Sequence, residues 1–138
     1  MNVEKCTDCL QKVVALLQEA CREVKVVVTV SPVRYAKYGF HGSMSSKATL
    51  LLAADKLATS NTETVVYFPA YELMNDELRD YRFYQPDMIH PSEQAVEYIY
   101  ERFMETFLSS EAKQFIAAWR PIKEALGHRP FHPESDEY

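Results

Sequence analysis

Hydrophobic residues in the first third of the chain recur first at the spacing of a helix and then form one continuous run. Between residues 10 and 24 they follow the ~3.6-residue period of a helix with one buried face, at Leu10, Val13, Val14, Leu17, Cys21 and Val24. This pattern predicts a helix over about residues 5–23. The next stretch, KVVVTV (25–30), is closed by Ser31-Pro32 and is typical of a strand buried on both faces of a parallel sheet, with helices on either side.

A second strand is predicted in TVVYF (64–68), which Pro69 ends, and a helix is predicted between the two strands. That helix, KATLLLAADKLAT (47–59), would be capped by a preceding serine, and its inner face would consist of Leu50, Leu51, Ala54 and Leu57. Strand, helix and strand in this order form a βαβ unit with a parallel pair of strands. The residues before the helix, 31–46, keep no period and contain two glycines, so we expect a long functional loop there.

Beyond Pro69 the pattern predicts helices joined by an aromatic loop. A short helix is expected in AYELMNDEL (70–78) and a loop in RDYRFYQPDMIH (79–90). A longer helix over about 91–108 would begin at Pro91, whose missing N–H is harmless at that position, and bury one face made of Val96, Ile99, Phe103 and Phe107. A last amphipathic segment ends near Gly127, with Phe115 and Trp119 in the core, and residues 128–138 form an acidic tail that we expect to be extended.

The two predicted strands are too few for a stable sheet of this kind. Parallel strands this apolar would leave their edges and half of their apolar surface in water. We therefore expect either that part of the sheet is missing from this sequence or that a partner supplies it. Such a partner would be a second copy in a homodimer or an N-terminal half-domain on another chain.

Length, composition and charge narrow the class of protein. The chain has 138 residues, 47% of them hydrophobic and 25% charged, which is typical of one soluble globular domain. It contains no apolar run of about 20 residues and no secretory signal, so we expect a cytoplasmic protein without a membrane partner. The formal net charge of −5 disfavours nucleic acid as a partner.

No cofactor or metal is predicted from the cysteines and histidines. Cys6-x-x-Cys9 lies at the start of a predicted helix with no strand before it, so reduced thiols are a better interpretation than a redox or zinc motif. His128 and His132 have the spacing of metal ligands, but Pro130 between them prevents the regular helix that would bring both rings to one side.

An acid and a base stand three residues apart in YQPDMIHPS (84–92). A carboxylate such as Asp87 can hold one ring nitrogen of His90, so that the other nitrogen faces a nucleophile. The alternative is structural, with Asp87 capping the helix that follows and His90 as a surface residue. The pair lies after the second predicted strand and just before the start of a helix, which is a common place for catalytic residues. Both interpretations nevertheless stay open.

Four blocks of the sequence resemble the GSCFA family, a branch of the SGNH-like hydrolases. They are VSPVR, HGSMSSKATLLLA, YFPAYELMNDELRDYRFYQPDMIHPSEQAVEYI and HRPFHPES. The resemblance implies an α/β fold, namely part of a flavodoxin-like three-layer sandwich that keeps the last two parallel strands and their flanking helices. It also implies that Asp87 is the acid and His90 the base of a catalytic triad. The family's Gly-Ser-Cys-Phe-Ala block, which carries the nucleophile, occurs nowhere in these 138 residues. We therefore expect residues 1–127 to be the C-terminal half of the domain.

Other residues of the same blocks are candidates for substrate binding. Arg34 and His41 match the family pattern and flank the loop after the first strand, where α/β sheets place their ligands. Ser43, where the family usually has asparagine, is a further polar candidate. Arg34 could instead form a structural ion pair with Asp80 or Glu72. For the remaining candidates the expected roles are structural: Lys47 on the solvated face of its helix, and Ser45 or Ser46 as the helix cap.

These observations predict a fragment of a serine ester hydrolase. In a complete domain a serine would attack an acyl ester, for example on a carbohydrate or a small molecule, with His90 as base and Asp87 orienting it. Alone, the chain would have almost no such activity. The alternative is a non-catalytic half-domain that completes its sheet by dimerisation or with an N-terminal partner chain.

Overall fold

Two parallel strands, β1 (Val26–Thr29) and β2 (Val65–Phe68), form the sheet in the computed structural model, which describes residues 2–127. The register places Val26 beside Val65 and Thr29 beside Phe68. The chain between the strands forms helix α2 (Gly39–Ser60), so the predicted order of strand, helix and parallel strand is confirmed. A mixture of helices with a parallel sheet agrees with the predicted α/β class, while the three-layer sandwich stays a prediction.

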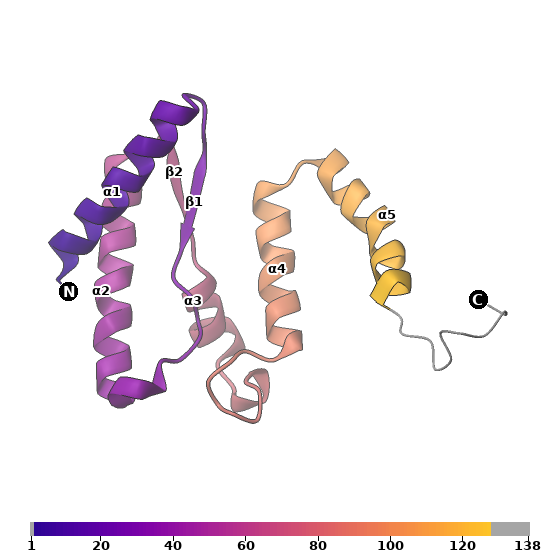
Figure 1. Cartoon of the computed structure of the whole chain (residues 1–138). Coiled ribbons are helices and arrows are strands. Elements are labelled where there is room, and N and C mark those ends of the chain that lie inside the picture. The colour runs from indigo at the N-terminus through magenta and orange to yellow at the C-terminus, as the bar shows by residue number, and fades with distance from the viewer. Residues whose placement is uncertain (1, 128–138) are drawn as a thin grey trace, which may run out of the picture. The chain divides into compact units, whose positions relative to one another are not determined.

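Helices α1 (Val3–Ala20) and α2 lie side by side and cover one face of this sheet (Figure 1). Their shared core consists of Val14, Leu57 and Val65, with Leu10, Val26, Val28 and Ala58 packed against it. The side chain of Asn2 caps α1 by accepting a hydrogen bond from the backbone N–H of Lys5 at 3.0 Å. The first predicted helix is therefore confirmed, with its end moved from about residue 23 to Ala20.

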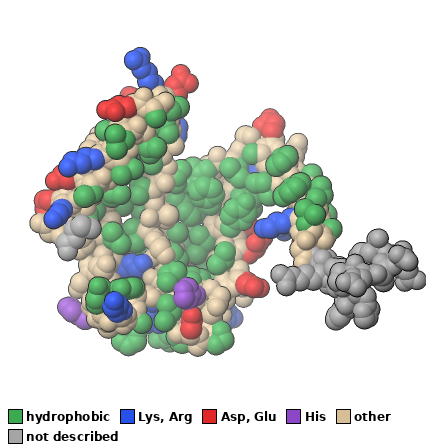
Figure 2. Space-filling view, viewed as in Figure 1, with side chains coloured by type: hydrophobic (Ala, Val, Ile, Leu, Met, Phe, Trp, Pro, Cys, Tyr) green, Lys and Arg blue, Asp and Glu red, His purple; other side chains and the backbone are tan. Residues whose placement is uncertain are grey.

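The other face of the sheet is open at two paired positions. Val27 and Val66 are opposite each other in the register and are 38% and 46% exposed. The prediction that the first strand is buried on both faces is therefore wrong for the described residues: exposure alternates along β1, as in a sheet with one covered face. Hydrophobic side chains, green in Figure 2, are frequent on the face shown there.

Helix α2 begins at Gly39, well before the predicted start, so the expected loop over 31–46 is shorter than predicted. A 3₁₀ turn, η1 (Ala36–Tyr38), leads into the helix, and Gly39 takes the positive φ of 72° that the change of direction requires. The residue before the helix, Tyr38, makes no side-chain cap, and Ser45 and Ser46 lie inside the helix instead of capping it. The predicted inner face is right at Ala54 and Leu57, which are buried, and wrong at Leu50, which is exposed.

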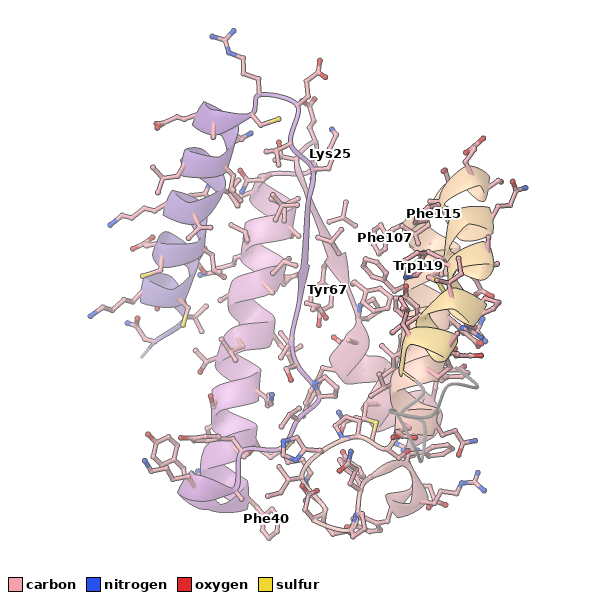
Figure 3. The ribbon with its side chains drawn as sticks, turned by 45° about the vertical axis from the view of Figure 1, so that its right-hand side comes forward. Lys25, Phe40, Tyr67, Phe107, Phe115 and Trp119 are labelled. Atoms are coloured by element: carbon pink, nitrogen blue, oxygen red, sulfur yellow. The ribbon has the colours of Figure 1, made fainter. Side chains whose placement is uncertain are left out.

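After β2 the chain forms α3 (Ala70–Glu72), which continues as the π-helical η2 (Leu73–Leu78) and so confirms the short predicted helix. A 3₁₀ turn, η3 (Tyr81–Phe83), and helix α4 (Glu93–Phe107) follow. These elements share a second core of four buried side chains: Met74, Leu78, Phe83 and Ala95. Tyr67 on β2, labelled in Figure 3, bonds through its hydroxyl to both carboxylate oxygens of Glu72 at 2.9 Å.

Helix α4 begins at Glu93 and not at Pro91 as predicted. The hydroxyl of Ser92 accepts from the backbone N–H of Ala95 at 3.3 Å, which is the bond of a helix cap. Pro91 instead lies in an isolated antiparallel bridge with Tyr84. In its first turn Ala95 is fully buried against this second core, and Val96 is exposed, contrary to prediction.

The chain divides into two compact units, one ending at Tyr100 and one beginning at Glu101. In the second unit, α5 (Ser110–Gly127) continues through Pro121 and ends where the sequence predicted. Phe115 and Trp119 on this helix (Figure 3) are exposed, so their predicted burial in a core is wrong. The predicted acidic tail, 128–138, lies outside the described residues.

Candidate active site and adjoining cavity

The segment YQPDMIHPS forms a loop whose two ends are held together by backbone hydrogen bonds. The N–H of Ser92 donates to the carbonyl of Phe83 at 2.7 Å, and the N–H of Gln85 donates to the carbonyl of His90 at 2.8 Å. At the tip, the N–H of Met88 donates to the carbonyl of Gln85 at 2.9 Å, and Met88 takes a positive φ of 59°. Asp87 and His90 are thus placed on a closed turn of defined geometry.

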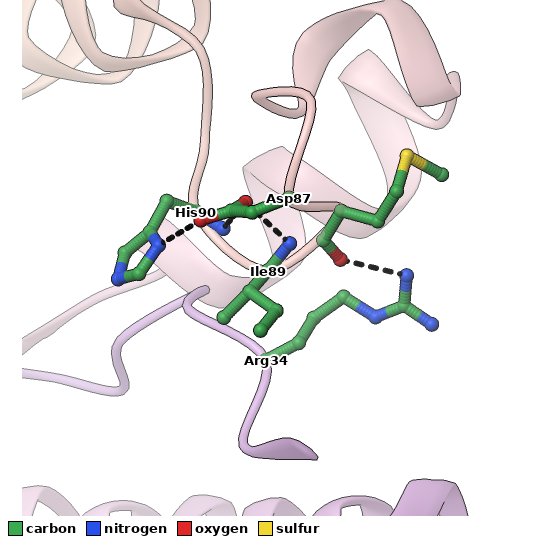
Figure 4. Close-up of polar contacts among 5 residues, drawn as sticks. Arg34, Asp87, Ile89 and His90 are labelled. Atoms are coloured by element: carbon green, nitrogen blue, oxygen red, sulfur yellow. Dashed lines mark hydrogen bonds and ion pairs between the residues drawn. The ribbon is translucent and has the colours of Figure 1, made fainter.

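Both oxygens of the Asp87 carboxylate are engaged within this turn. One accepts from the backbone N–H groups of Ile89 and His90, at 2.8 and 3.0 Å, and the other lies 2.6 Å from Nδ1 of His90 (Figure 4). Because an ionised carboxylate only accepts, Nδ1 carries the proton and donates it. In the neutral imidazole the lone pair is then on Nε2, and no described residue bonds to this nitrogen.

The hydrogen bond from the His90 side chain is the main cause that lowers the pKa of Asp87 to about 2. The backbone N–H groups of His90 and Ile89 lower it further, because all three bonds favour the charged carboxylate. The side chains of Asp87 and His90 are 42% and 55% exposed. The arrangement can therefore orient an imidazole and stabilise its protonated form at a site that is open to solvent.

Asp87 does not cap helix α4, so the alternative prediction that it is the cap of this helix is wrong. The cap is Ser92, and Asp87 bonds to the turn before it. The carboxylate nevertheless has a structural share in the loop, because one of its oxygens holds two backbone N–H groups.

Arg34, in the segment after β1, connects this loop to the rest of the unit. Its backbone N–H donates to the carbonyl of Ile89 at 3.0 Å. Its Nη1 donates to the carbonyl of Met88 at 3.1 Å, the bond drawn from Arg34 in Figure 4. Its guanidinium group also lies over the rings of Phe40 and Tyr84, at 5.1 and 5.5 Å from their centroids. The segment after the first strand and the Asp87–His90 loop therefore meet, as expected for two segments at the same end of a parallel sheet.

The alternative in which Arg34 pairs with Asp80 or Glu72 is wrong. Asp80 accepts from the backbone N–H of Arg82 at 2.9 Å, and Glu72 bonds to the Tyr67 hydroxyl. Among the described residues, no carboxylate forms an ion pair with Arg34.

A cavity of about 440 Å³ lies beside Arg34 in the first unit. Its walls come from α2, from the segment after β1, and from the chain between α3 and the Asp87–His90 loop. Its lining side chains are Pro32, Arg34, Phe40, Ser43, Met44, Lys47, Tyr71, Met74, Asn75, Arg79, Asp80, Tyr81 and Tyr84. Two of the predicted binding residues, Arg34 and Ser43, are thus brought together in one cavity wall.

Lys47 is a member of this cavity that the sequence did not indicate. It was expected on the solvated face of its helix, but it is only 9% exposed, so that prediction is wrong. Its Nζ donates to the carbonyl of Ser31 and lies 5.9 Å from the ring centroid of Tyr71. Burial lowers the pKa of Lys47. The spacing from Ser43, a predicted binding residue, could have indicated the position of Lys47, because residues four apart lie on the same face of a helix.

The remaining site candidates have other positions. Ser43 is buried, and its hydroxyl accepts from the backbone N–H of Tyr35 at 3.2 Å. His41 is exposed in the first turn of α2 and does not line the cavity, and neither do Asp87 and His90. The cavity and the Asp87–His90 loop are instead linked through Arg34 and Tyr84.

The described residues form neither a metal site nor a membrane span. Within residues 2–127, no group of three His, Cys, Asp or Glu side chains is arranged to hold a metal ion. Cys6 is buried, Cys9 and Cys21 are exposed, and all three are free thiols. His128 and His132 lie outside the described residues. No helix in the described part of the chain has the length and apolar character needed to cross a bilayer.

Comparisons with known proteins give one match. The model of the GSCFA family matches residues 1–103, which is most of the chain. No curated protein and no solved structure matches.

Proposed function

Because the chain belongs to the GSCFA family, we propose that it serves the hydrolysis of acyl esters, with His90 as general base and Asp87 as the acid that orients it. The observation that carries the proposal is the 2.6 Å contact between Nδ1 of His90 and the Asp87 carboxylate. It supports a histidine with a fixed tautomer whose second nitrogen can take a proton from a nucleophile and return it to the leaving group. Arg34, His41 and Ser43 are proposed to contact the substrate, a small-molecule or carbohydrate ester.

The nucleophile has to come from outside this sequence. No Gly-Ser-Cys-Phe-Ala block is present in the 138 residues, so the proposal places the attacking serine on a segment or partner chain that docks beside the Asp87–His90 loop. The open lone pair at Nε2 and the exposure of His90 are consistent with such docking. Without the serine, hydrolysis would fall by a factor on the order of 10⁶, as in triads that lose their nucleophile.

The test is a complementation assay with p-nitrophenyl acetate. The chain is assayed alone and then mixed with a polypeptide that carries a Gly-Ser-Cys-Phe-Ala block, and hydrolysis is expected only in the mixture. In the mixture, His90→Ala should reduce turnover by a factor of about 10³ or more, and Asp87→Asn by a comparable factor. Asp55→Asn, the same change at an exposed carboxylate on α2, is the matched control and should keep the full rate. Full turnover in the His90→Ala mixture would refute the proposal.

A second, non-catalytic function is favoured by the open sheet. Val27 and Val66 are side by side and 38% and 46% exposed, although parallel sheets are normally covered on both faces. In this alternative a homodimer or an N-terminal half-domain partner completes the sheet, and the role of the chain is assembly. It predicts association that depends on concentration and can be measured by sedimentation.

A further inference from the structure

The cavity beside Arg34 concentrates positive charge in an acidic protein. Its lining contains three cationic side chains, Arg34, Lys47 and Arg79, and one carboxylate, Asp80, whereas the whole chain has a formal net charge of −5. Arg79 forms an ion pair with Asp76 at 3.8 Å, so the cavity cations that pair with no carboxylate of the described residues are Arg34 and Lys47. A cavity with this balance attracts anions.

Lys47 is buried without a counter-ion. An ammonium group has three N–H donors, and within residues 2–127 the only hydrogen-bond acceptor of Lys47 is the carbonyl of Ser31. No carboxylate of the described residues pairs with it, although buried charges are normally paired. A 9% exposed cation in a cavity wall, with donors to spare, is the arrangement expected where a ligand supplies the negative charge.

Arg34 presents a second cation to the same cavity. The rings of Phe40 and Tyr84 hold its guanidinium group, and the carbonyl of Met88 uses only Nη1. The other N–H donors of a guanidinium lie in one plane and match the two oxygens of a carboxylate or phosphate. Because Arg34 also holds the loop between Asp87 and His90, a group bound to it would be anchored next to that loop.

We propose that this cavity binds a compact oxyanion, a carboxylate or a phosphate, through Lys47 and Arg34, so that the ester substrate carries such a group. A volume of about 440 Å³ is within the ordinary range of small-molecule sites, roughly 300–1,000 Å³. The part of this inference that concerns the substrate rests on the proposed hydrolysis. The part that concerns anion binding does not, since it can be measured with no ester present.

The experiment is a titration of the full chain with inorganic phosphate and, separately, with acetate, at constant ionic strength, followed by amide chemical shifts. Saturable binding of at least one anion is expected, and the tighter of the two identifies the group. Lys47→Met should weaken binding by at least about tenfold, because it removes one partner of a buried charge pair. Lys56→Met is the matched control: Lys56 lies on the same helix, outside the cavity, and pairs with Glu4 at the surface. It should change affinity by less than about twofold, since exposed ion pairs contribute little.

Arg34→Gln gives an independent variant for the same prediction, and circular dichroism establishes that each variant is folded before it is titrated. If Lys47→Met does not fold, the loss of affinity in Arg34→Gln decides the question. Absence of saturable binding to both anions, or an equal loss in Lys47→Met and Lys56→Met, would overturn the inference. Specific anion binding without hydrolysis in the complementation assay would refute the proposed reaction and leave the anion site supported.

Discussion

At the scale of residues, the candidate site combines one local pair with one long-range contact. The contact between Asp87 and His90 was predictable, because three residues of separation allow a carboxylate to reach an imidazole across a turn. The cavity cation Lys47 was not predictable by the same reasoning, since a lysine in a helix is normally solvated and only the fold shows that its helix face is covered. The contact within the loop could be predicted from the sequence, and the burial of this polar residue could not.

The Asp87 carboxylate gives a prediction about pH. Its pKa is lowered in the folded chain to about 2, from an ordinary value of 3.8. Its contribution to stability is therefore complete above about pH 4 and is lost as the pH falls through about 2. The difference in the free energy of unfolding between the wild type and Asp87→Asn, measured with urea from pH 6 to pH 2, should be constant down to about pH 4 and then shrink. A difference that stays constant to pH 2 would contradict this.

Lys47 gives a prediction about stability. Its burial without a counter-ion is unfavourable, and replacing a buried charge by an apolar side chain is often neutral or stabilising. At neutral pH we expect the free energy of unfolding of Lys47→Met to equal that of the wild type or to exceed it by up to about 1 kcal/mol. Lys56→Met should remain within about 0.5 kcal/mol of the wild type. A clear loss of stability in Lys47→Met would mean that its bond to Ser31 is mainly structural.

At the scale of elements, the start of α2 was the largest error of prediction. The inner positions of its first turns are Ser43 and Lys47, which are buried against the cavity and not against an apolar core. Two hydrophobic side chains that also line the cavity, Phe40 and Met44, are exposed. In an ordinary helix the buried positions are apolar and the exposed positions are polar. Here the buried positions are polar, so a search for apolar residues at helical spacing predicts a loop. The strands and α1, whose inner faces are apolar, were predicted within a few residues.

The observed helix starts predict opposite effects for two serines. Ser92→Ala should lower the free energy of unfolding by about 1 kcal/mol, because it removes the cap of α4. Ser46→Ala should be neutral or slightly stabilising, since Ser46 lies inside α2 and alanine has the higher helix propensity. Urea denaturation of both variants measures the two effects. A loss of about 1 kcal/mol in Ser46→Ala would restore its predicted role as a cap.

At the scale of the whole molecule, the match to the family and the division of the chain nearly coincide. The family match ends at residue 103, and the first unit ends at Tyr100, so α5 is outside the match. The candidate site and the cavity both lie within the first unit. The parallel pairing of the two strands could be predicted from the sequence. Which faces of the sheet are buried could not, because that depends on which elements or chains pack against them.

A shortened chain tests whether the first unit is self-sufficient. A chain that ends at Phe107 should keep the amide chemical shifts of residues 2–92 and the anion affinity of the full chain within about twofold, because no cavity residue lies beyond Tyr84. Loss of the dispersed spectrum on truncation would show that the second unit is needed for the fold of the first.

The open sheet gives a prediction about association. If a second copy covers Val27 and Val66, the chain should form dimers whose population rises with concentration in sedimentation experiments. Val66→Lys should abolish them, because a charge at the centre of an apolar contact cannot be desolvated cheaply. Lys56→Glu, a charge change on the surface of α2, is the control. A chain that stays monomeric at all concentrations would leave a different partner chain as the occupant of this face.

The bonds from Arg34 to the Asp87–His90 loop also bear on the order of folding. Nη1 of Arg34 and the carbonyl of Met88 are 54 residues apart in the sequence, whereas Asp87 and His90 are three apart. Contacts between distant residues require closure of a long chain segment, and they form late when topology limits the rate. The acid–base pair can therefore form transiently in a chain with no sheet. We expect its attachment through Arg34 and Met88 to form later, together with the pairing of the two strands.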